Sequence, residues 1–221
     1  MLAFNDKHKG ERCFIMGNGP SLKDTDLTLL KNEFTFGMNR IYLLFDRIDF
    51  PISYFVSVNR LVLEQCAHDI SRLPCPKFIS WHARDLIEFT EDMMFLLPKP
   101  EPAFHADITR GVWGGATVTF VALQVAYYLG FHKVVLVGVD HSFKTRGKPH
   151  ATVVSPGDDL NHFDPGYFGK GFRWQLPDLE TSEQAYRMAR SHYERAGREV
   201  LDATIGGKLQ VFPKVDYHSL F

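Results

Sequence analysis

Four polar side chains stand where apolar stretches of the sequence end: Asn18, Asn39, Asn59 and Asp140. The amide of Asn offers both hydrogen-bond donors and an acceptor, which suits sugar hydroxyls, a ribose or a phosphate ester. If the apolar stretches are parallel strands, their carboxyl ends meet at one edge of a sheet, where ligands of α/β proteins bind. Each Asn alone could be an ordinary turn residue, but the repetition predicts a ligand pocket.

The first of these ends lies in the run Gly17-Asn18-Gly19-Pro20-Ser21. We expect the backbone of this turn to lie directly against a ligand. Gly17 and Gly19 can take positive φ, and because they have no side chain they leave room for a phosphate. Ser21 could cap a short helix whose free N–H groups attract anions. Because the run matches neither the Walker P-loop nor the G-x-G-x-x-G fingerprint, it predicts a less common kind of nucleotide site.

Thr109, Arg110 and Gly111 precede the strongest helix pattern of the chain, residues 114–129. Glycine allows a ligand to approach a helix N-terminus closely, and Arg can hold a phosphate through two parallel hydrogen bonds. The alternative is a helix cap followed by a surface arginine. We expect these residues to cradle a phosphate.

His162 is the candidate general base, because a neutral imidazole near pH 7 accepts a proton readily. It is flanked by carboxylates and aromatic residues in a stretch, residues 143–179, that has no clear periodicity. So long a stretch is expected to be a lid. A loop histidine without chemistry is the alternative. A zinc site shared with His141 and His150 is not favoured, since their spacing matches no standard motif.

The bulk composition excludes several classes of protein. The chain has 221 residues, is 45% hydrophobic and carries a net charge of −1, so we expect a folded core and no polybasic surface for nucleic acid or membrane. It has no apolar run of the ~18 residues that span a bilayer and no signal-peptide pattern at its start, so a cytoplasmic location is expected. Three scattered cysteines predict buried thiols.

Strand and helix patterns alternate along the chain. Strands are expected at 13–16, 34–38, 53–58, 77–80, 93–97, 134–137 and 199–201, and helices at 24–30, 60–69, 114–129 and 181–196. A hairpin-like tail is expected at 206–212. Such alternation predicts one α/β domain over residues 1–221, with a parallel sheet, helices on both faces and the lid at about 143–179.

Several of these segments resemble two related groups of enzymes. They are Gly-Asn-Gly-Pro-Ser-Leu (17–22), Gly-Met-Asn-Arg (37–40), Val-Asn (58–59), Thr-Arg-Gly-Val (109–112), Leu-Val-Gly-Val-Asp (136–140) and Asn-His-Phe (161–163). One group is the single-domain bacterial sialyltransferases, with a Rossmann-like domain of the GT-A type and a lid. The other is the family of domains similar to the archaeal 6-hydroxymethylpterin pyrophosphokinase, which includes the motility-associated-factor flagellin glycosyltransferases.

The likeness covers nearly the whole chain and is stronger to the second group. Its members often also carry Phe-Asp-Pro-x-Tyr-Phe-Gly-Lys-Gly, here residues 163–171, and a tail like residues 206–212. Likeness to the sialyltransferases implies that Asn18, Gly19, Asn39 and Asn59 hold a CMP-sugar donor. It also implies that His162 is the base that deprotonates the acceptor, and that no metal is needed.

Two departures from the sialyltransferases stand out. Their Arg-Ile-Thr-Ser-Gly-Val is here Asp-Ile-Thr-Arg-Gly-Val (107–112), and the tyrosines that support their leaving phosphate are replaced by His141, Ser142 and Phe143. We expect Arg110, His141 and Lys170 to supply compensating charge at the leaving phosphate.

The leading hypothesis is therefore an inverting glycosyltransferase that transfers the sugar of a nucleotide-activated donor, expected to be CMP-linked, to a glycan acceptor. Arg110 and His162 would act in catalysis, and the donor would be held by Gly17, Asn18, Gly19, Pro20, Ser21, Asn39, Asn59, Thr109, Gly111, Asp140 and His141. No metal or other cofactor is expected. The aromatic content would permit a homo-oligomer.

Two alternatives stay open. A pyrophosphokinase that transfers diphosphate from ATP to a hydroxymethyl pterin would need Mg²⁺, for which Asp140, Asp158, Asp159 and Asp164 could serve. A binding module without activity is the third hypothesis.

Overall fold

The computed structural model describes residues 1–145 and 147–221. Its centre is a seven-stranded sheet in the order β5-β4-β3-β2-β1-β6-β9, in which all neighbouring strands are parallel. The strands are β1 (Arg12–Met16), β2 (Phe34–Met38), β3 (Tyr54–Ser57), β4 (Lys77–Ser80), β5 (Met93–Leu96), β6 (Lys133–Val137) and β9 (Glu199–Asp202). The sheet confirms the predicted α/β class with a parallel, Rossmann-like arrangement.

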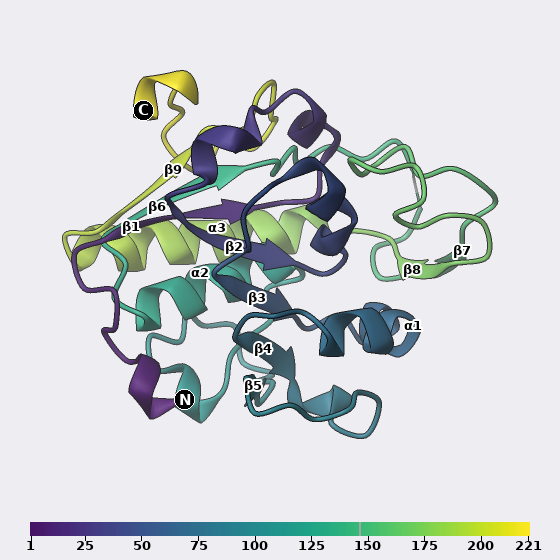
Figure 1. The fold of residues 1–221 in the computed structure, drawn as a ribbon, viewed down its shortest axis with the longest axis horizontal. Helices are drawn as coiled ribbons and strands as arrows, with labels where there is room; N and C mark the ends of the chain where they lie inside the picture. The colour runs from purple at the N-terminus through teal and green to yellow at the C-terminus, as the bar shows by residue number, and fades with distance from the viewer. Residues whose placement is uncertain (146) are drawn as a thin grey trace.

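Helices cover both faces of this sheet, as predicted (Figure 1). The side chains of β1 alternate: Cys13 and Ile15 join the core against α2 (Val118–Tyr128) and α3 (Leu179–Arg195), whereas Phe14 and Met16 face the other way. That second face is covered by α1 (Arg60–Ser71), by short 3-10 helices and by part of the lid. Burial on both faces explains why the strands read as continuous apolar runs.

The strand order reverses between β1 and β6. From β1 the chain proceeds to β2, β3, β4 and β5 on one side, and then crosses back to add β6 and β9 on the other. The crossing uses α2, whose residues are almost all buried. A reversal of this kind opens a crevice at the carboxyl ends of the two central strands, where ligands of such folds bind.

The crossover helix starts later than the sequence pattern indicates. We expected it from residue 114, but α2 begins at Val118, with Thr117 as its N-cap accepting a hydrogen bond from the backbone of Thr119. The expectation fails because Gly115 and Ala116 both take positive φ, which no helix continues through. The preference of helices for Thr at the N-cap was the signal to follow.

The lid contains more regular structure than its sequence indicates. Within residues 143–179, β7 (Thr152–Val154) pairs antiparallel with β8 (Arg173–Gln175). This small hairpin projects beyond the main sheet in Figure 1. Its strands have three residues each, too few to produce a period that sequence analysis can detect. The hairpin was therefore not predicted.

The expected hairpin at residues 206–212 does not form. Among the described residues, this tail makes no strand, and it is held instead by separate contacts such as the Lys208 amide, which donates to the Asp140 carbonyl. Lys214 forms an isolated parallel bridge with Asp202, which extends the β9 edge. The apolar residues of the tail, Leu209, Val211 and Phe212, fill the core beside α3 rather than pairing with one another.

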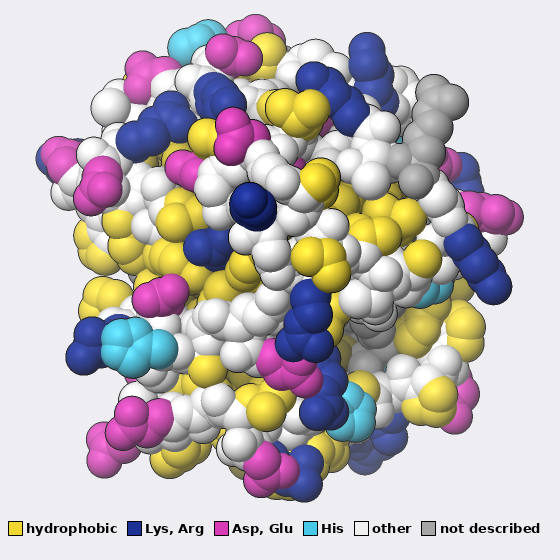
Figure 2. Space-filling model, turned by 90° about the vertical axis from the view of Figure 1, so that its right-hand side faces the viewer, with side chains coloured by type: hydrophobic (Ala, Val, Ile, Leu, Met, Phe, Trp, Pro, Cys, Tyr) yellow, Lys and Arg dark blue, Asp and Glu magenta, His cyan; other side chains and the backbone are white. Residues whose placement is uncertain are grey.

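The face on the lid side carries acidic, basic and hydrophobic side chains interspersed, without a large field of one sign (Figure 2). In the part of the chain that the structure describes, no helix is both long enough and apolar enough to cross a bilayer. The three cysteines are free and buried, as expected.

Candidate functional site

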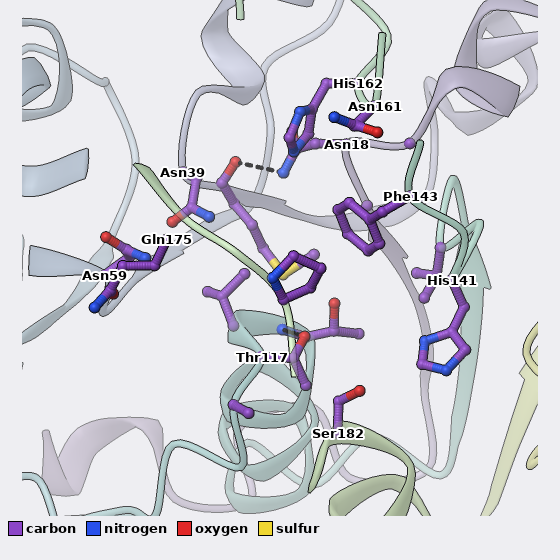
Figure 3. Close-up of a pocket in the computed structure, with 18 of the residues that line it drawn as sticks. Asn18, Asn39, Asn59, Thr117, His141, Phe143, Asn161, His162, Gln175 and Ser182 are labelled. Carbon is purple, nitrogen blue, oxygen red and sulfur yellow. Dashed lines mark hydrogen bonds between the residues drawn. The ribbon is translucent and has the colours of Figure 1, made fainter. Parts of the chain in front are cut away.

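A pocket of about 350 Å³ lies at the carboxyl ends of β1, β2, β3 and β6. Three parts of the chain line it: the turns after these strands, the start of α2 with the start of α3, and the lid. In Figure 3, His162 and Asn18 lie on one side of the cavity and Thr117 and Ser182 on the other, with Asn39, Asn59 and Gln175 to one flank. A cavity therefore lies at the strand ends, where the sequence predicts a ligand site.

The first turn is glycine-rich for a reason other than the one expected. Neither Gly17 nor Gly19 has positive φ. A Cβ at Gly17 would overlap the carbonyl oxygen of Gly138, and one at Gly19 would overlap the Asp140 carboxyl. The glycines therefore let the turns after β1 and β6 pass close to each other, and the space they leave is filled by the protein itself.

Asp140 holds this crossing together. Its carboxylate accepts hydrogen bonds from the Ser21 backbone at 3.1 Å and from the Ser21 hydroxyl at 2.7 Å. Burial raises the pKa of the Asp140 carboxyl above its ordinary value, against the opposite effect of those two bonds. Ser21 is thus a partner of Asp140 inside the 3-10 helix Pro20–Lys23, and the expectation that it caps that helix was wrong.

The three strand-end asparagines all line the pocket, each with one part of its amide used internally. Asn18 donates to the Met38 carbonyl at 3.2 Å, and its Oδ1 is buried without a partner among the described residues. Asn39, at φ 51°, accepts from the Ser57 hydroxyl at 3.0 Å. Asn59 caps α1 by accepting from the Val62 amide at 3.2 Å. The internal bonds fix the orientation of each amide beside the cavity.

Five of the predicted binding or catalytic residues lie outside the lining. Pro20 and Ser21 lie in the 3-10 helix that follows the first turn. Thr109 and Arg110 belong to the 3-10 helix Ile108–Arg110, and Gly111 is its C-cap. The Arg110 side chain is 85% exposed and lies 3.6 Å from Asp107. Gly111 is needed where the chain passes Leu97, because a Cβ there would contact the Leu97 carbonyl at 2.5 Å. We carry none of these five into the proposed site.

The part of this motif that does reach the cavity comes later, at residues 114–119. Thr117, the N-cap of α2, shares a hydrogen bond of 3.2 Å with the Tyr186 hydroxyl of α3. Thr117, Val118 and Thr119 at the start of α2 line the pocket, and Ser182 lies on the same side as Thr117 (Figure 3). Helix starts of this kind favour anions. Sequence analysis missed Thr117, Ser182 and Tyr186, although the Thr N-cap signal was available.

The lid brings His162 to the opposite side, with a carboxylate behind it. His162 Nδ1 lies 2.7 Å from Asp159 Oδ2, and its ring stacks on Tyr167 at 4.0 Å between centroids. Burial alone would raise the pKa of Asp159, but its hydrogen bonds to His162 and to the amides of Asn161 and Phe168 outweigh burial and lower it. Because a carboxylate only accepts, Nδ1 carries the hydrogen and Nε2 is left as the basic atom.

Two further histidines of the lining also face carboxylates. His141 Nε2 lies 3.2 Å from Glu183 of α3, and His150 Nε2 lies 3.1 Å from Asp178, the N-cap of α3. The His141 side chain is 8% exposed, whereas that of His150 is 59% exposed at the mouth of the pocket. His141 is thus placed at the cavity as predicted. Lys170 is outside the lining.

Charge in the lining is sparse. None of the described lining residues is Lys or Arg, and the acidic ones are Asp140 and Asp178. Within residues 1–145 and 147–221, no three His, Cys, Asp or Glu side chains gather as a metal site would require. What the pocket offers a ligand is amides, hydroxyls, imidazoles, a helix start and aromatic rings. These groups can bind a sugar or nucleotide and can move one proton.

Comparisons with known proteins give one informative match. No family model matches the sequence, and no curated protein matches it either. Among solved structures, a MAf glycosyltransferase from Magnetospirillum magneticum AMB-1 is similar, with a TM-score of 0.63 and 18% sequence identity. The match covers 98% of this chain and 35% of that chain, so the present sequence spans about a third of that enzyme's length. At this identity the likeness shows a shared α/β, Rossmann-like fold.

Proposed function

We propose that this chain is an inverting glycosyltransferase that uses a nucleotide-activated sugar, with a CMP-linked sugar as the expected donor, in the synthesis of a bacterial surface glycan. The observation that carries the proposal is the position of His162 across the cavity from Thr117, the N-cap of α2 (Figure 3). Asp159 is hydrogen-bonded to His162 Nδ1. A base on one side and an anion-binding helix start on the other is the arrangement that an in-line displacement requires. The fold shared with a solved glycosyltransferase supports the proposal.

In the proposed reaction, an acceptor hydroxyl beside His162 attacks the anomeric carbon of the donor sugar. The new C–O bond forms as the bond from that carbon to the phosphate oxygen breaks. The hydroxyl proton passes to Nε2 of His162, and the electron pair leaves with the nucleotide phosphate. Asp159 stabilises the imidazolium and fixes the tautomer, which is the role of a carboxylate behind a catalytic histidine.

The start of α2 would receive the phosphate. A helix N-terminus carries roughly half a positive charge, which attracts a phosphate. The Thr119 and Phe120 amides already donate to Thr117, so this attraction would come chiefly from the helix dipole. The described lining adds no Lys or Arg to this charge. Such a pocket suits a phosphodiester with a single negative charge, as in a CMP-linked sugar, better than a diphosphate. Asn18, Asn39 and Asn59 would hydrogen-bond the sugar and ribose hydroxyls.

We propose that the reaction needs no metal. The pyrophosphokinase alternative assigns Mg²⁺ to Asp140, Asp158, Asp159 and Asp164, but Asp140 is bonded to Ser21, Asp159 to His162 and Asp164 to the Gly166 amide. These bonds are the ones that shape the crossing and orient the histidine. If Asp140 and Asp159 bound a metal instead, the bond that holds the crossing of the two turns and the bond that orients His162 would be lost.

The test is release of free nucleotide from CMP-, UDP- and GDP-linked sugars in the presence of glycan acceptors, each with and without EDTA. We expect release from a CMP-linked sugar that EDTA leaves unchanged. Formation of AMP from ATP and a hydroxymethyl pterin, abolished by EDTA, would establish the alternative instead. If no nucleotide raises the melting temperature of the protein, both enzymatic proposals fail, because a ligand at 100 times its dissociation constant adds about 2.7 kcal/mol of stability.

A further inference from the structure

Arg40 follows Asn39 directly, yet its side chain turns away from the cavity toward the lid. Its Nη1 donates to the carbonyl oxygen of Gly166 at 2.8 Å and also to that of Tyr167. Its Nε donates to the Tyr42 hydroxyl at 3.1 Å. One guanidinium thus joins the end of β2 to a single turn of the lid.

Aromatic rings surround this guanidinium. Its carbon lies 5.1 Å from the ring centroid of Phe172, 5.8 Å from that of Tyr42 and 5.9 Å from that of Tyr167. Cations at such distances are attracted to the ring faces, more strongly where water is partly excluded, as it is here. Only Arg combines a planar fork for two carbonyls with a flat surface for the rings, so Lys would reproduce only part of the contact.

The turn that Arg40 holds is the one that supports His162. The imidazole stacks on Tyr167 at an interplanar angle of 9°, and Asp159 Oδ2 accepts from both His162 Nδ1 and the Phe168 amide. The ring plane and the hydrogen-bond partner of His162 therefore both depend on residues 166–168. On the other side of His162 in the chain, the Phe163 amide donates to the Asn18 carbonyl at 2.9 Å and so ties this segment to the end of β1.

We infer that Arg40 is a positioning residue for His162. It couples the strand end that carries Asn39 to the turn that sets the imidazole, so that a donor bound at the strand ends meets a base already in place. The inference rests on the proposed function of His162 as the general base. Arg40 itself touches no substrate, because it is outside the lining of the pocket.

A second attachment of the lid supplies the matched control. Gln65 of α1 bonds both the amide and the carbonyl of Arg173, at 2.9 and 2.8 Å, and thereby holds the β7–β8 hairpin without contacting the His162 turn. Gln65→Ala removes the two bonds to the Arg173 backbone, while the Arg40 bonds to residues 166 and 167 and the Asp159–His162 bond stay in place. The hairpin also keeps its Glu64–Arg173 contact and the stacking of Phe172 and Trp174 on Phe168. If any weakening of the lid lowers turnover, this variant and the Arg40 variants will behave alike.

The experiment compares Arg40→Gln, Arg40→Lys and Gln65→Ala with the wild type. For Arg40→Gln we expect kcat to fall about 10- to 100-fold, the cost of misplacing a catalytic group by about 1 Å, with donor affinity unchanged. Arg40→Lys should recover part of the loss, and Gln65→Ala should keep kcat within about twofold. An unchanged kcat in Arg40→Gln, or an equal fall in Gln65→Ala, would overturn the inference.

A second readout does not depend on transfer. Because the His162 ring stacks on Tyr167, we expect the NMR signals of its ring protons to lie upfield in the wild type. Arg40→Gln should reduce that shift, and Gln65→Ala should preserve it. If the wild type transfers no sugar, the proposed function fails, and the NMR shift alone then decides the inference. An undiminished shift in Arg40→Gln contradicts it.

Discussion

The two sides of the pocket are built by different kinds of contact. On the strand-end side, Asn18, Asn39 and Asn59 extend from adjacent parallel strands whose backbone ladder fixes their spacing. On the lid side, His162 is held by side-chain contacts with Asp159 and Tyr167, within a segment whose paired strands have three residues each.

The difference indicates that the strand-end side binds the donor and the lid side transfers the proton. A backbone ladder places several weak donors and acceptors at fixed spacing, which is what affinity for a polar ligand needs. Side-chain contacts orient a single group, which is what proton transfer needs. Changes on the lid side should therefore lower turnover and leave donor affinity alone, whereas changes on the strand-end side should do the reverse.

The largest effect is expected from His162→Ala. Removal of a general base should lower kcat by ~10²–10⁴-fold, with the affinity for donor nucleotide kept, because the strand-end amides are untouched. Steady-state kinetics and calorimetric titration of the nucleotide measure the two quantities. Wild-type kcat in this variant would remove His162 from the mechanism.

Asp159→Asn should come next, with kcat about 10²-fold lower. The amide can donate to Nδ1, which shifts the hydrogen of the imidazole to Nε2, the atom that must accept the proton. Asn nearly matches Asp in shape, so the packing is kept, but an amide NH2 in place of Oδ2 also faces the Phe168 N–H. The variant therefore tests the charge and the hydrogen bonds of Asp159 together. ¹⁵N NMR of His162 reports the tautomer directly, and an unchanged tautomer together with normal turnover would refute the assignment.

Gly17→Ala tests the strand-end side. Its Cβ would overlap the Gly138 carbonyl, which is backbone and cannot rotate away, so we expect about 1–3 kcal/mol of lost unfolding free energy and weaker nucleotide binding. Gly157→Ala is the control, since nothing lies within 4 Å of the added Cβ. Urea denaturation compares them, and equal stability of the two variants would count against the tight crossing.

Asn39 allows its two contributions to be separated. Asn39→Gly keeps the positive φ and removes the amide, so nucleotide affinity should fall about fivefold to tenfold, the value of one hydrogen bond. Asn39→Ala should show the same loss of affinity. Its free energy of unfolding should in addition be about 1 kcal/mol lower than that of Asn39→Gly, because Ala is strained at φ 51°. Normal affinity in both variants would exclude Asn39 from donor binding.

The smallest effect is on acid stability. The pKa of Asp159 lies below its ordinary value in the folded state, so its contribution to stability is complete above the unfolded pKa of about 4 and is lost as pH falls through the folded pKa. Urea midpoints measured at about pH 5 and about pH 3 should therefore differ more in the wild type than in Asp159→Asn. Equal differences would argue that the carboxylate is not held as described.

Much of the fold could be predicted from local patterns of apolar and polar residues in the sequence. Each of the seven strands of the main sheet is found where a strand was predicted. The central strands β1 and β6 are largely apolar because they are buried on both faces, whereas the edge strand β9 reads Glu-Val-Leu-Asp and alternates in burial. The small β7–β8 hairpin and the late start of α2 escaped prediction. The first is too short to show a period, and the second depends on the positive φ of Gly115 and Ala116.

The sequence by itself determined the polar strand ends, because residues that end adjacent parallel strands must meet at one edge of the sheet. It also singled out His162. Only the tertiary structure decided that Asp159 stands behind His162, that Gly17 and Gly19 make room for Gly138 and Asp140, and that Arg110 points to solvent. These facts depend on contacts between residues or on how a loop turns, and no local pattern of residue types encodes them.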